Sequence, residues 1–293
     1  GDRERGKLNL PKRKVIPTLA EYSRTYLELY KTAKENTLCA RKVCVNNLTR
    51  YFGDYRLDRI TPFVVERFRI ERKEKDQVND GTVNDDVKFL SHIYTVAIKE
   101  GIVDTNPCKE VKRLKVTQTK DRVLSPEEIR LILELPQDKD RMMILTSLFT
   151  GMRLNEVLNL KWSDIDFARG LITFTQGKTG KFIAMPLSDY LRGELQGYRG
   201  NDAADRIYET GDLTKAIGKK YSKHFSHLFK GLGIHNFTFH NLRHTFSSLQ
   251  SELGTGVVVT KDLLGHSTGS SPLAISRNTN NHCYLDSVLS TNM

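Results

Sequence analysis

Two histidines and an arginine stand close together in residues 239–246, which read FHNLRHTF. Residues three and four apart are neighbours on an α-helix, so the side chains of His240, Arg243 and His244 are expected on one face, while the apolar residues between them turn towards a core. A guanidinium can hold two oxygens of a phosphate, and a histidine beside it can move a proton near neutral pH. The segment therefore indicates phosphate chemistry, although a helix with one buried histidine and two solvated basic groups fits the same residues.

A second arginine follows a glycine break in residues 150–156, which read TGMRLNE. Arg153, at the start of a helix, would lie beside free backbone N–H groups, where an anion is favoured. Two interpretations stay open: Arg153 and Glu156 form an ordinary surface pair, or Glu156 holds Arg153 in position for a ligand.

Further candidates lie between and beyond these two segments. Lys178, with Lys181 as its competitor, lies at a tight turn and is either solvated or able to reach into a DNA groove. His266 follows a glycine that stops a helix, where a histidine is either structural or presented to an open face. A tyrosine could attack phosphorus only in a cationic pocket, because its free pKa is about 10. We expect no metal and no cofactor, since no carboxylate cluster is apparent.

The composition favours a DNA-binding protein of two domains. The 293 residues exceed what one hydrophobic core usually serves. A net charge of +11 attracts polyanions, and nucleic acid is the leading partner. The four cysteines form no CxxC pair, and no apolar run is long enough for a membrane span. We therefore expect no membrane partner and a cytosolic location.

The N-terminal part of the chain is expected to be helical. Thr18 can cap a first helix that begins at Leu19, and apolar spacing predicts further helices over 37–52, 63–75 and 82–100. The pair Asp80-Gly81 is expected to separate the last two helices. A basic, apolar-poor stretch over 109–123 then predicts a linker.

The second part of the chain is expected to mix helices and strands. Ser125 to Glu128 has the composition of a capping box and begins this part. Helices are predicted over 142–149 and 154–160, with further helices after Leu213. Two strands, 171–175 and 182–185, flank the turn that holds Lys178.

At this point three sequence boxes resemble those of the tyrosine recombinases of the phage integrase family. The boxes are residues 150–156, residues 240–244 (HNLRH) and residues 264–267 (LGHS), in the family's order, and Lys178 matches the family's hairpin lysine. The resemblance covers nearly the whole chain.

The resemblance implies a mainly α fold with a small β-sheet in an α+β catalytic domain, a helical-bundle, SAM-like core-binding domain, and a C-shaped clamp on DNA. The expected segments are a polar arm over 1–16, the core-binding domain over 17–108, the linker over 109–123, the catalytic domain over 124–268 and an atypical tail over 269–293.

The resemblance also implies a role for each candidate. Arg153 and Arg243 would clamp the scissile phosphate, His266 would donate to a non-bridging oxygen, His240 would accept the nucleophile's proton, and Lys178 would protonate the leaving 5′ oxygen. Glu156 and His244 would support them. The product would be a 3′-phosphotyrosyl linkage, and strand exchange would pass through a Holliday junction without metal or ATP.

The implied partners are a double-stranded recombination site and further copies of the chain, with a dimer on one site, a tetramer in synapsis and accessory DNA-bending proteins. Alternatives are a cleavage-deficient site-binding or architectural factor and a topoisomerase of the same chemistry. Basic residues of the linker and of the third helix are expected to contact DNA, with an ordinary solvated face as the alternative for the helix. They are Lys112, Arg113, Lys115, Arg67 and Arg72.

The nucleophile departs from the family's pattern. Where the family places its tyrosine, this chain has Ile275, and the tyrosine that follows the third box is Tyr284, 18 residues after His266. Three interpretations stay open: an insertion still delivers Tyr284, the tail is altered and the chain does not cleave, or another molecule supplies the tyrosine.

Overall fold

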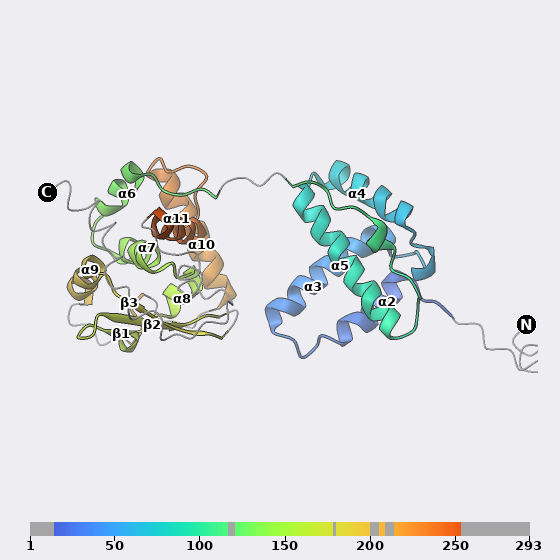
Figure 1. The fold of residues 1–293 in the computed structure, drawn as a ribbon, viewed down its shortest axis with the longest axis horizontal. Coiled ribbons are helices and arrows are strands. Elements are labelled where there is room, and N and C mark those ends of the chain that lie inside the picture. Colours follow the sequence, from blue (N-terminus) through green and yellow to red (C-terminus); the bar gives the residue numbers. More distant parts are fainter. Residues whose placement is uncertain (1–14, 117–120, 178–179, 200–204, 209–213, 253–293) are drawn as a thin grey trace, which may run out of the picture. The chain divides into compact units, whose positions relative to one another are not determined.

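The computed structural model describes residues 15–116, 121–177, 180–199, 205–208 and 214–252. The chain divides into two compact units, residues 1–118 and residues 119–293 (Figure 1). The expected mainly helical fold with a small sheet is confirmed. Within the described residues, no helix is long and apolar enough to cross a membrane.

Within residues 15–116, four helices build the first unit, and capping residues account for where three of them start. The side chain of Thr18 accepts a hydrogen bond from the backbone N–H of Glu21, so the predicted cap of the first helix is confirmed. Thr61 caps a later helix in the same way, ahead of Pro62. The helices are α2 (Leu19–Glu28), α3 (Glu35–Phe52), α4 (Pro62–Asp76) and α5 (Asp80–Lys99), with short 3-10 turns at Leu57–Arg59 and Pro107–Glu110.

One prediction for this unit is wrong. Asp80 and Gly81 do not separate two helices, because Asn79 accepts the backbone N–H of Thr82 and thereby starts α5 at Asp80. Gly81 lies inside the first turn of that helix.

Aromatic side chains fill the core of the first unit. Tyr22 and Tyr26 of α2 pack with Phe52 of α3 and Phe68 of α4. The hydroxyl of Tyr94, on α5, donates a 2.7 Å hydrogen bond to the carbonyl of Leu57, which satisfies a buried polar group. The core therefore fixes how the four helices pack.

Both ends of the expected linker are attached to the unit they adjoin. The side chain of Asn84 on α5 bonds both the backbone N–H and the carbonyl of Leu114. At the other end, the carbonyl of Arg122 accepts from Asn241, and the backbone N–H of Leu124 donates to Thr245.

The second unit is built around one buried helix, α7 (Lys139–Thr150), in which every residue from Arg141 onward is buried. The predicted capping box at Ser125 is confirmed and starts α6 (Pro126–Leu133). The helix α11 (Phe239–Glu252), which contains the HNLRH segment, packs along the central helix α7. The other helices are α8 (Leu154–Asn159), α9 (Asp189–Arg199) and α10 (Lys215–Gly231), with a 3-10 turn at Trp162–Asp164.

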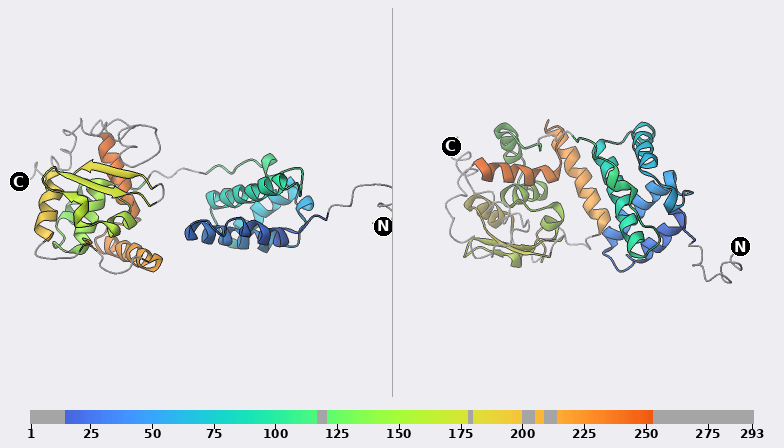
Figure 2. Two further views of the ribbon diagram at one scale, coloured as in Figure 1. Left: turned by 90° about the horizontal axis from the view of Figure 1, so that it is seen from below. Right: turned by 45° about the vertical axis from the view of Figure 1, so that its right-hand side comes forward.

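A three-stranded antiparallel sheet lies on one outer side of this unit (Figures 1 and 2). Its order is β1 (Ile165–Asp166), β2 (Leu171–Thr175) and β3 (Phe182–Pro186), and Phe174 faces Ile183 in the register of the last two strands. The two predicted strands are confirmed. The short strand β1 and the helix α9 were not predicted.

Candidate active site

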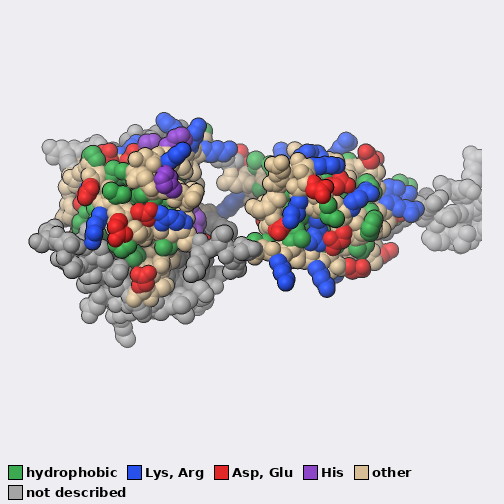
Figure 3. All heavy atoms as spheres, turned by 90° about the horizontal axis from the view of Figure 1, so that it is seen from above, with side chains coloured by type: hydrophobic (Ala, Val, Ile, Leu, Met, Phe, Trp, Pro, Cys, Tyr) green, Lys and Arg blue, Asp and Glu red, His purple; other side chains and the backbone are tan. Residues whose placement is uncertain are grey.

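The helix α11 presents His240, Arg243 and His244 together, as the sequence predicted. Phe239 and Leu242 are buried in the core of the unit and fix the rotation of the helix about its axis. The start of the helix is held by Asn241, whose side-chain oxygen accepts from the backbone N–H of Thr238 at 2.8 Å. Figure 3 shows histidine side chains on one face of this unit beside lysines and arginines.

Arg243 is the buried cation of the site. It is 5% exposed, and its Nη1 donates a 2.7 Å hydrogen bond to the carbonyl of Gly151. Burial and the positive charge of Arg153 lower the pKa of Arg243 to about 10, and the carboxylate of Glu156 opposes that lowering. The guanidinium therefore keeps its charge at neutral pH while it lies close to a second one.

Gly151 joins the two arginine segments. It ends α7 with a φ of 67°, in the left-handed region that a side chain disfavours. The turn directs the chain into Met152 and Arg153, while the carbonyl of Gly151 receives the bond from Arg243. A glycine break thus brings residues 90 positions apart in the sequence to one place.

Glu156 holds Arg153 through two contacts. One carboxylate oxygen accepts the backbone N–H of Arg153 at 2.8 Å, and the other accepts from its Nη1 at 2.9 Å. The side chain of Glu156 is 5% exposed, whereas that of Arg153 is 32% exposed. A buried carboxylate that anchors a half-exposed guanidinium leaves part of that guanidinium open to an outside anion.

His240 lies next to these cations and stays accessible from solvent. Its ring meets the ring of His244 edge to face, with centroids 4.9 Å apart. Desolvation lowers the pKa of His240, and the positive charges of His244, Arg243 and Arg153 lower it further. The imidazole is thereby kept neutral and able to accept a proton.

Three sequence candidates lie outside the described residues: Lys178, His266 and Tyr284. The strands on either side of Lys178 are described, and the backbone N–H of Gln176 bonds the carbonyl of Lys181 at 2.9 Å. The structure brings together Arg153, Glu156, His240, Arg243 and His244.

Sequence reasoning missed two features near this site. Asp121 carries a carboxylate 3.1 Å from Nδ1 of His244, and its position in an expected linker gave no signal for that contact. The helix α10 presents a row of exposed lysines, and no acidic residue occurs in it. Charge counting along 215–231 would have found the second feature. The lysines are Lys219, Lys220, Lys223 and Lys230.

Arg72, which was expected to contact DNA, is buried in the first unit. Its side chain is 7% exposed, and its Nε lies 2.9 Å from a carboxylate oxygen of Asp86, which is 5% exposed. Asp76 also pairs with it. Because α4 is amphipathic, Arg72 faces the inside of the unit, where both of its carboxylate partners neutralise it.

The other expected DNA contacts lie on the surface. Arg67 is exposed, but it pairs with Glu71 at 3.4 Å and donates to the hydroxyl of Tyr55 at 2.8 Å. The linker residues Lys112, Arg113 and Lys115 are exposed. The surface cations of α4 are thus largely neutralised by carboxylates.

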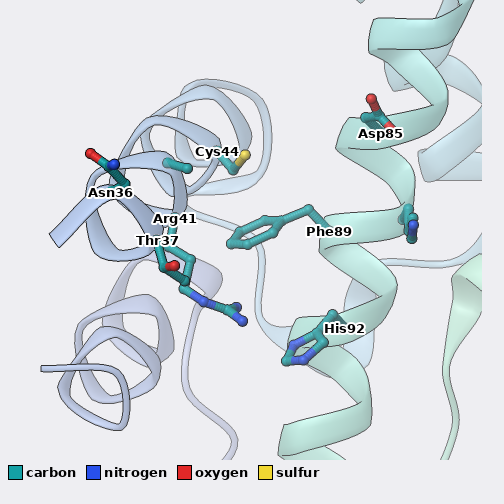
Figure 4. A pocket seen from close by; sticks show the side chains of 9 residues that line it. Asn36, Thr37, Arg41, Cys44, Asp85, Phe89 and His92 are labelled. Atoms are coloured by element: carbon teal, nitrogen blue, oxygen red, sulfur yellow. The ribbon is translucent and has the colours of Figure 1, made fainter. Parts of the chain in front are cut away.

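A pocket of about 510 Å³ lies between α3 and α5 in the first unit. Figure 4 shows Phe89 of α5 pointing towards Arg41 of α3, with Cys44 and His92 beside it. Arg41 stacks over the ring of Tyr30 at 3.6 Å and also bonds the hydroxyl of Tyr26. These contacts hold Arg41 in the wall of the pocket.

Two family profiles match the chain. The profile described as the phage integrase family matches residues 122–274, and the profile described as the phage integrase SAM-like domain matches residues 18–114.

Individual relatives agree with these profiles. Tyrosine recombinase XerA of Pyrococcus furiosus is 32% identical over 184 residues, which cover 59% of this chain and 64% of that protein, so less than two thirds of the relative is matched. The ICEBs1 integrase of Bacillus subtilis is 26% identical over 80% of this chain and 71% of its own length. A lambda integrase tetramer bound to a Holliday junction shares the fold, with a TM-score of 0.75 and 22% identity over 92% of this chain and 83% of that chain.

Proposed function

Because the chain belongs to the phage integrase family of tyrosine recombinases, we propose that it cuts and rejoins DNA at specific sites through a 3′-phosphotyrosyl intermediate. The observation that carries the proposal is the pair of neighbouring guanidiniums, Arg153 and Arg243. Burial and the positive charge of Arg153 lower the pKa of Arg243, and an anion bound by both guanidiniums would offset their mutual repulsion.

The proposed chemistry assigns each group one step. Arg153 and Arg243 hold the non-bridging oxygens of the scissile phosphate and stabilise the charge that builds on them, while His266 donates to one of these oxygens. The phenol oxygen of Tyr284 attacks phosphorus, and His240 takes the phenol's proton. The bond to the 5′ oxygen breaks, and Lys178 gives that oxygen a proton.

The reverse reaction with a new 5′ hydroxyl rejoins the strand. Since one phosphate ester replaces another, strand exchange needs neither ATP nor a metal. Two sequential exchanges would pass through a Holliday junction.

The proposed assembly is two copies on one site and four in synapsis, with DNA-bending proteins as accessory partners. Lambda integrase is seen as a dimer on a core site and as a tetramer on a Holliday junction, which supports the proposal. We also predict that the two units close around the duplex as a clamp. The predicted location is the prokaryotic cytoplasm, at the nucleoid.

A two-site assay tests this function against its rivals. A recombinase converts two marked sites into recombinant products, and the yield requires both sites. A relaxing topoisomerase would instead unwind supercoiled DNA that carries no site. A site-binding factor would shift the DNA in a gel and leave every strand uncut, and either of these outcomes would contradict the proposal.

The pH dependence of cleavage should report His240. A general base must be neutral, so cleavage should slow as pH falls through its pKa. The environment lowers that pKa, so the midpoint of the acid limb should lie below the ordinary histidine value of about 6.5. Single-turnover cleavage of a suicide duplex between pH 5 and pH 8 measures it. His240→Gln should remove the limb, and a midpoint above the ordinary value would contradict the assignment.

The linker lysines should contribute more to DNA binding than the lysines of α4. Lys112→Ala/Lys115→Ala should flatten the salt dependence of binding, by up to about 0.9 in log–log slope for each lost phosphate contact. Lys73→Ala/Lys75→Ala is the matched control, because Lys73 pairs with Asp80 and Lys75 with Glu71. Fluorescence anisotropy at several salt concentrations compares the two. If the two double variants show equal salt-dependence slopes, the linker lysines are not the main DNA contact.

A further inference from the structure

The chain that enters the second unit is bonded to the first two turns of α11. The side chain of Asn241 donates to the carbonyl of Arg122 at 3.2 Å, and Thr245 accepts the backbone N–H of Leu124 at 3.1 Å. Between these two contacts, Nδ1 of His244 lies 3.1 Å from Oδ2 of Asp121. The segment 121–124 therefore follows the face of α11 that carries the proposed base.

The ring of His244 contacts two side chains: the carboxylate of Asp121 and the ring of His240. Nδ1 of His244 lies 3.1 Å from the carboxylate of Asp121, close enough for an N–H on that nitrogen to donate to it, and such a bond would fix the rotation of the ring. The fixed ring then meets His240 edge to face, at a centroid distance of 4.9 Å. His240 and His244 are four residues apart, so α11 itself keeps them adjacent.

We propose that Asp121 is a positioning residue that orients His240 through His244. This inference rests on the proposed function, in which His240 is the base. Without the carboxylate, the ring of His244, which is 32% exposed, is free to turn into solvent. His240 then loses the neighbour that limits its own rotation, and a small misplacement of a reacting group costs much of its rate.

A positioning role for Asp121 and a purely electrostatic role predict different effects when its carboxylate is removed. The groups that face His240 are mainly cationic: Arg243 and His244 on α11, and Arg153 from the start of α8. Asp121 is the carboxylate among them, and its side chain is 69% exposed. If it acted by charge alone, its removal would strengthen DNA binding and leave cleavage equal or faster. A positioning role predicts slower cleavage at unchanged affinity.

Three substitutions separate the roles in the full chain. With saturating suicide duplex, Asp121→Ala should cleave about 10-fold more slowly, with DNA affinity within about 2-fold of the wild type. Asp121→Asn should stay within about 3-fold of the wild-type rate, because the amide oxygen still accepts the N–H of His244. Glu134→Ala, at an exposed carboxylate just after α6, is the matched control and should change neither quantity.

The order of effects tests the route through His244. In a His244→Ala background, Asp121→Ala should slow cleavage no further. If the double variant instead loses rate by the product of the two single losses, the proposal is overturned. A wild-type cleavage rate for Asp121→Ala would overturn it too.

A spectroscopic readout keeps this inference separate from the proposed function. In ¹⁵N-histidine-labelled full-length protein, Asp121→Ala should shift the ring-nitrogen signals of His240, whereas Asp121→Asn should leave them near their wild-type positions. His240→Gln assigns those signals. If the wild type fails to cleave DNA, the proposed function fails, and the NMR comparison still decides whether Asp121 orients His240. Unchanged His240 signals in Asp121→Ala would overturn the inference.

Discussion

Arg243→Ala is expected to reduce DNA cleavage by on the order of 10²–10³-fold or more, the loss typical of removing one preorganised group that stabilises transition-state charge. The buried guanidinium lies near enough to Arg153 for that charge to lower its pKa, and the carbonyl of Gly151 accepts a hydrogen bond from it. Lysine cannot reproduce a two-pronged grip on a phosphate, so Arg243→Lys should recover little activity. Single-turnover cleavage of a suicide duplex measures both variants.

DNA affinity must be measured beside the cleavage rate. The variant should keep most of its affinity, because surface cations away from this site supply much of the binding free energy. Arg130→Ala, at an exposed arginine on α6, is the control and should cleave normally. Thermal unfolding shows whether the loss of the bond to Gly151 unfolds the unit. Arg243→Ala that remains folded and cleaves within a few fold of the wild type would contradict the phosphate clamp.

Arg72→Ala is expected to destabilise the first unit by about 3–5 kcal/mol, the usual cost of removing one partner from a buried ion pair. Asp86 would remain 5% exposed with its closest cation gone. The unfolding transition of this unit in urea, followed in the full chain, measures the change.

A paired substitution gives the control for this prediction. Arg72→Met/Asp86→Leu removes both charges and should be much closer to the wild type in stability, because no buried charge is left alone. If Arg72→Ala instead kept the free energy of unfolding within about 1 kcal/mol of the wild type and weakened DNA binding, Arg72 would be a DNA contact after all.

Local sequence signals predicted much of the fold. Thr18 and Ser125 start helices because each side chain caps the backbone three residues on, a rule that needs no tertiary information. The strands β2 and β3 were recognisable from local sequence too, as short apolar runs on either side of a glycine-bounded segment. The pair Asp80-Gly81 misled the prediction because Asn79, one residue earlier, caps the helix, which therefore already includes both residues.

Long-range partners could not be predicted in this way. Arg72 looked like a surface cation until Asp86, on the next helix, faced it in the core. Asp121 and His244 are 123 residues apart in the sequence, and only the packing of the segment 121–124 on α11 brings them together. The proximity of Arg153 and Arg243 was implied by the family resemblance and depends on the carbonyl of Gly151.

The central claim is that this chain forms a covalent bond to DNA through a tyrosine. The direct measurement is to incubate the protein with a suicide recombination site, separate covalent complexes on a denaturing gel, and sequence the nucleotide-bearing peptide by mass spectrometry. The account predicts a 3′-linked adduct on Tyr284 that disappears in Tyr284→Phe. A chain that binds the site but yields no adduct, or an adduct that Tyr284→Phe leaves unchanged, would contradict it.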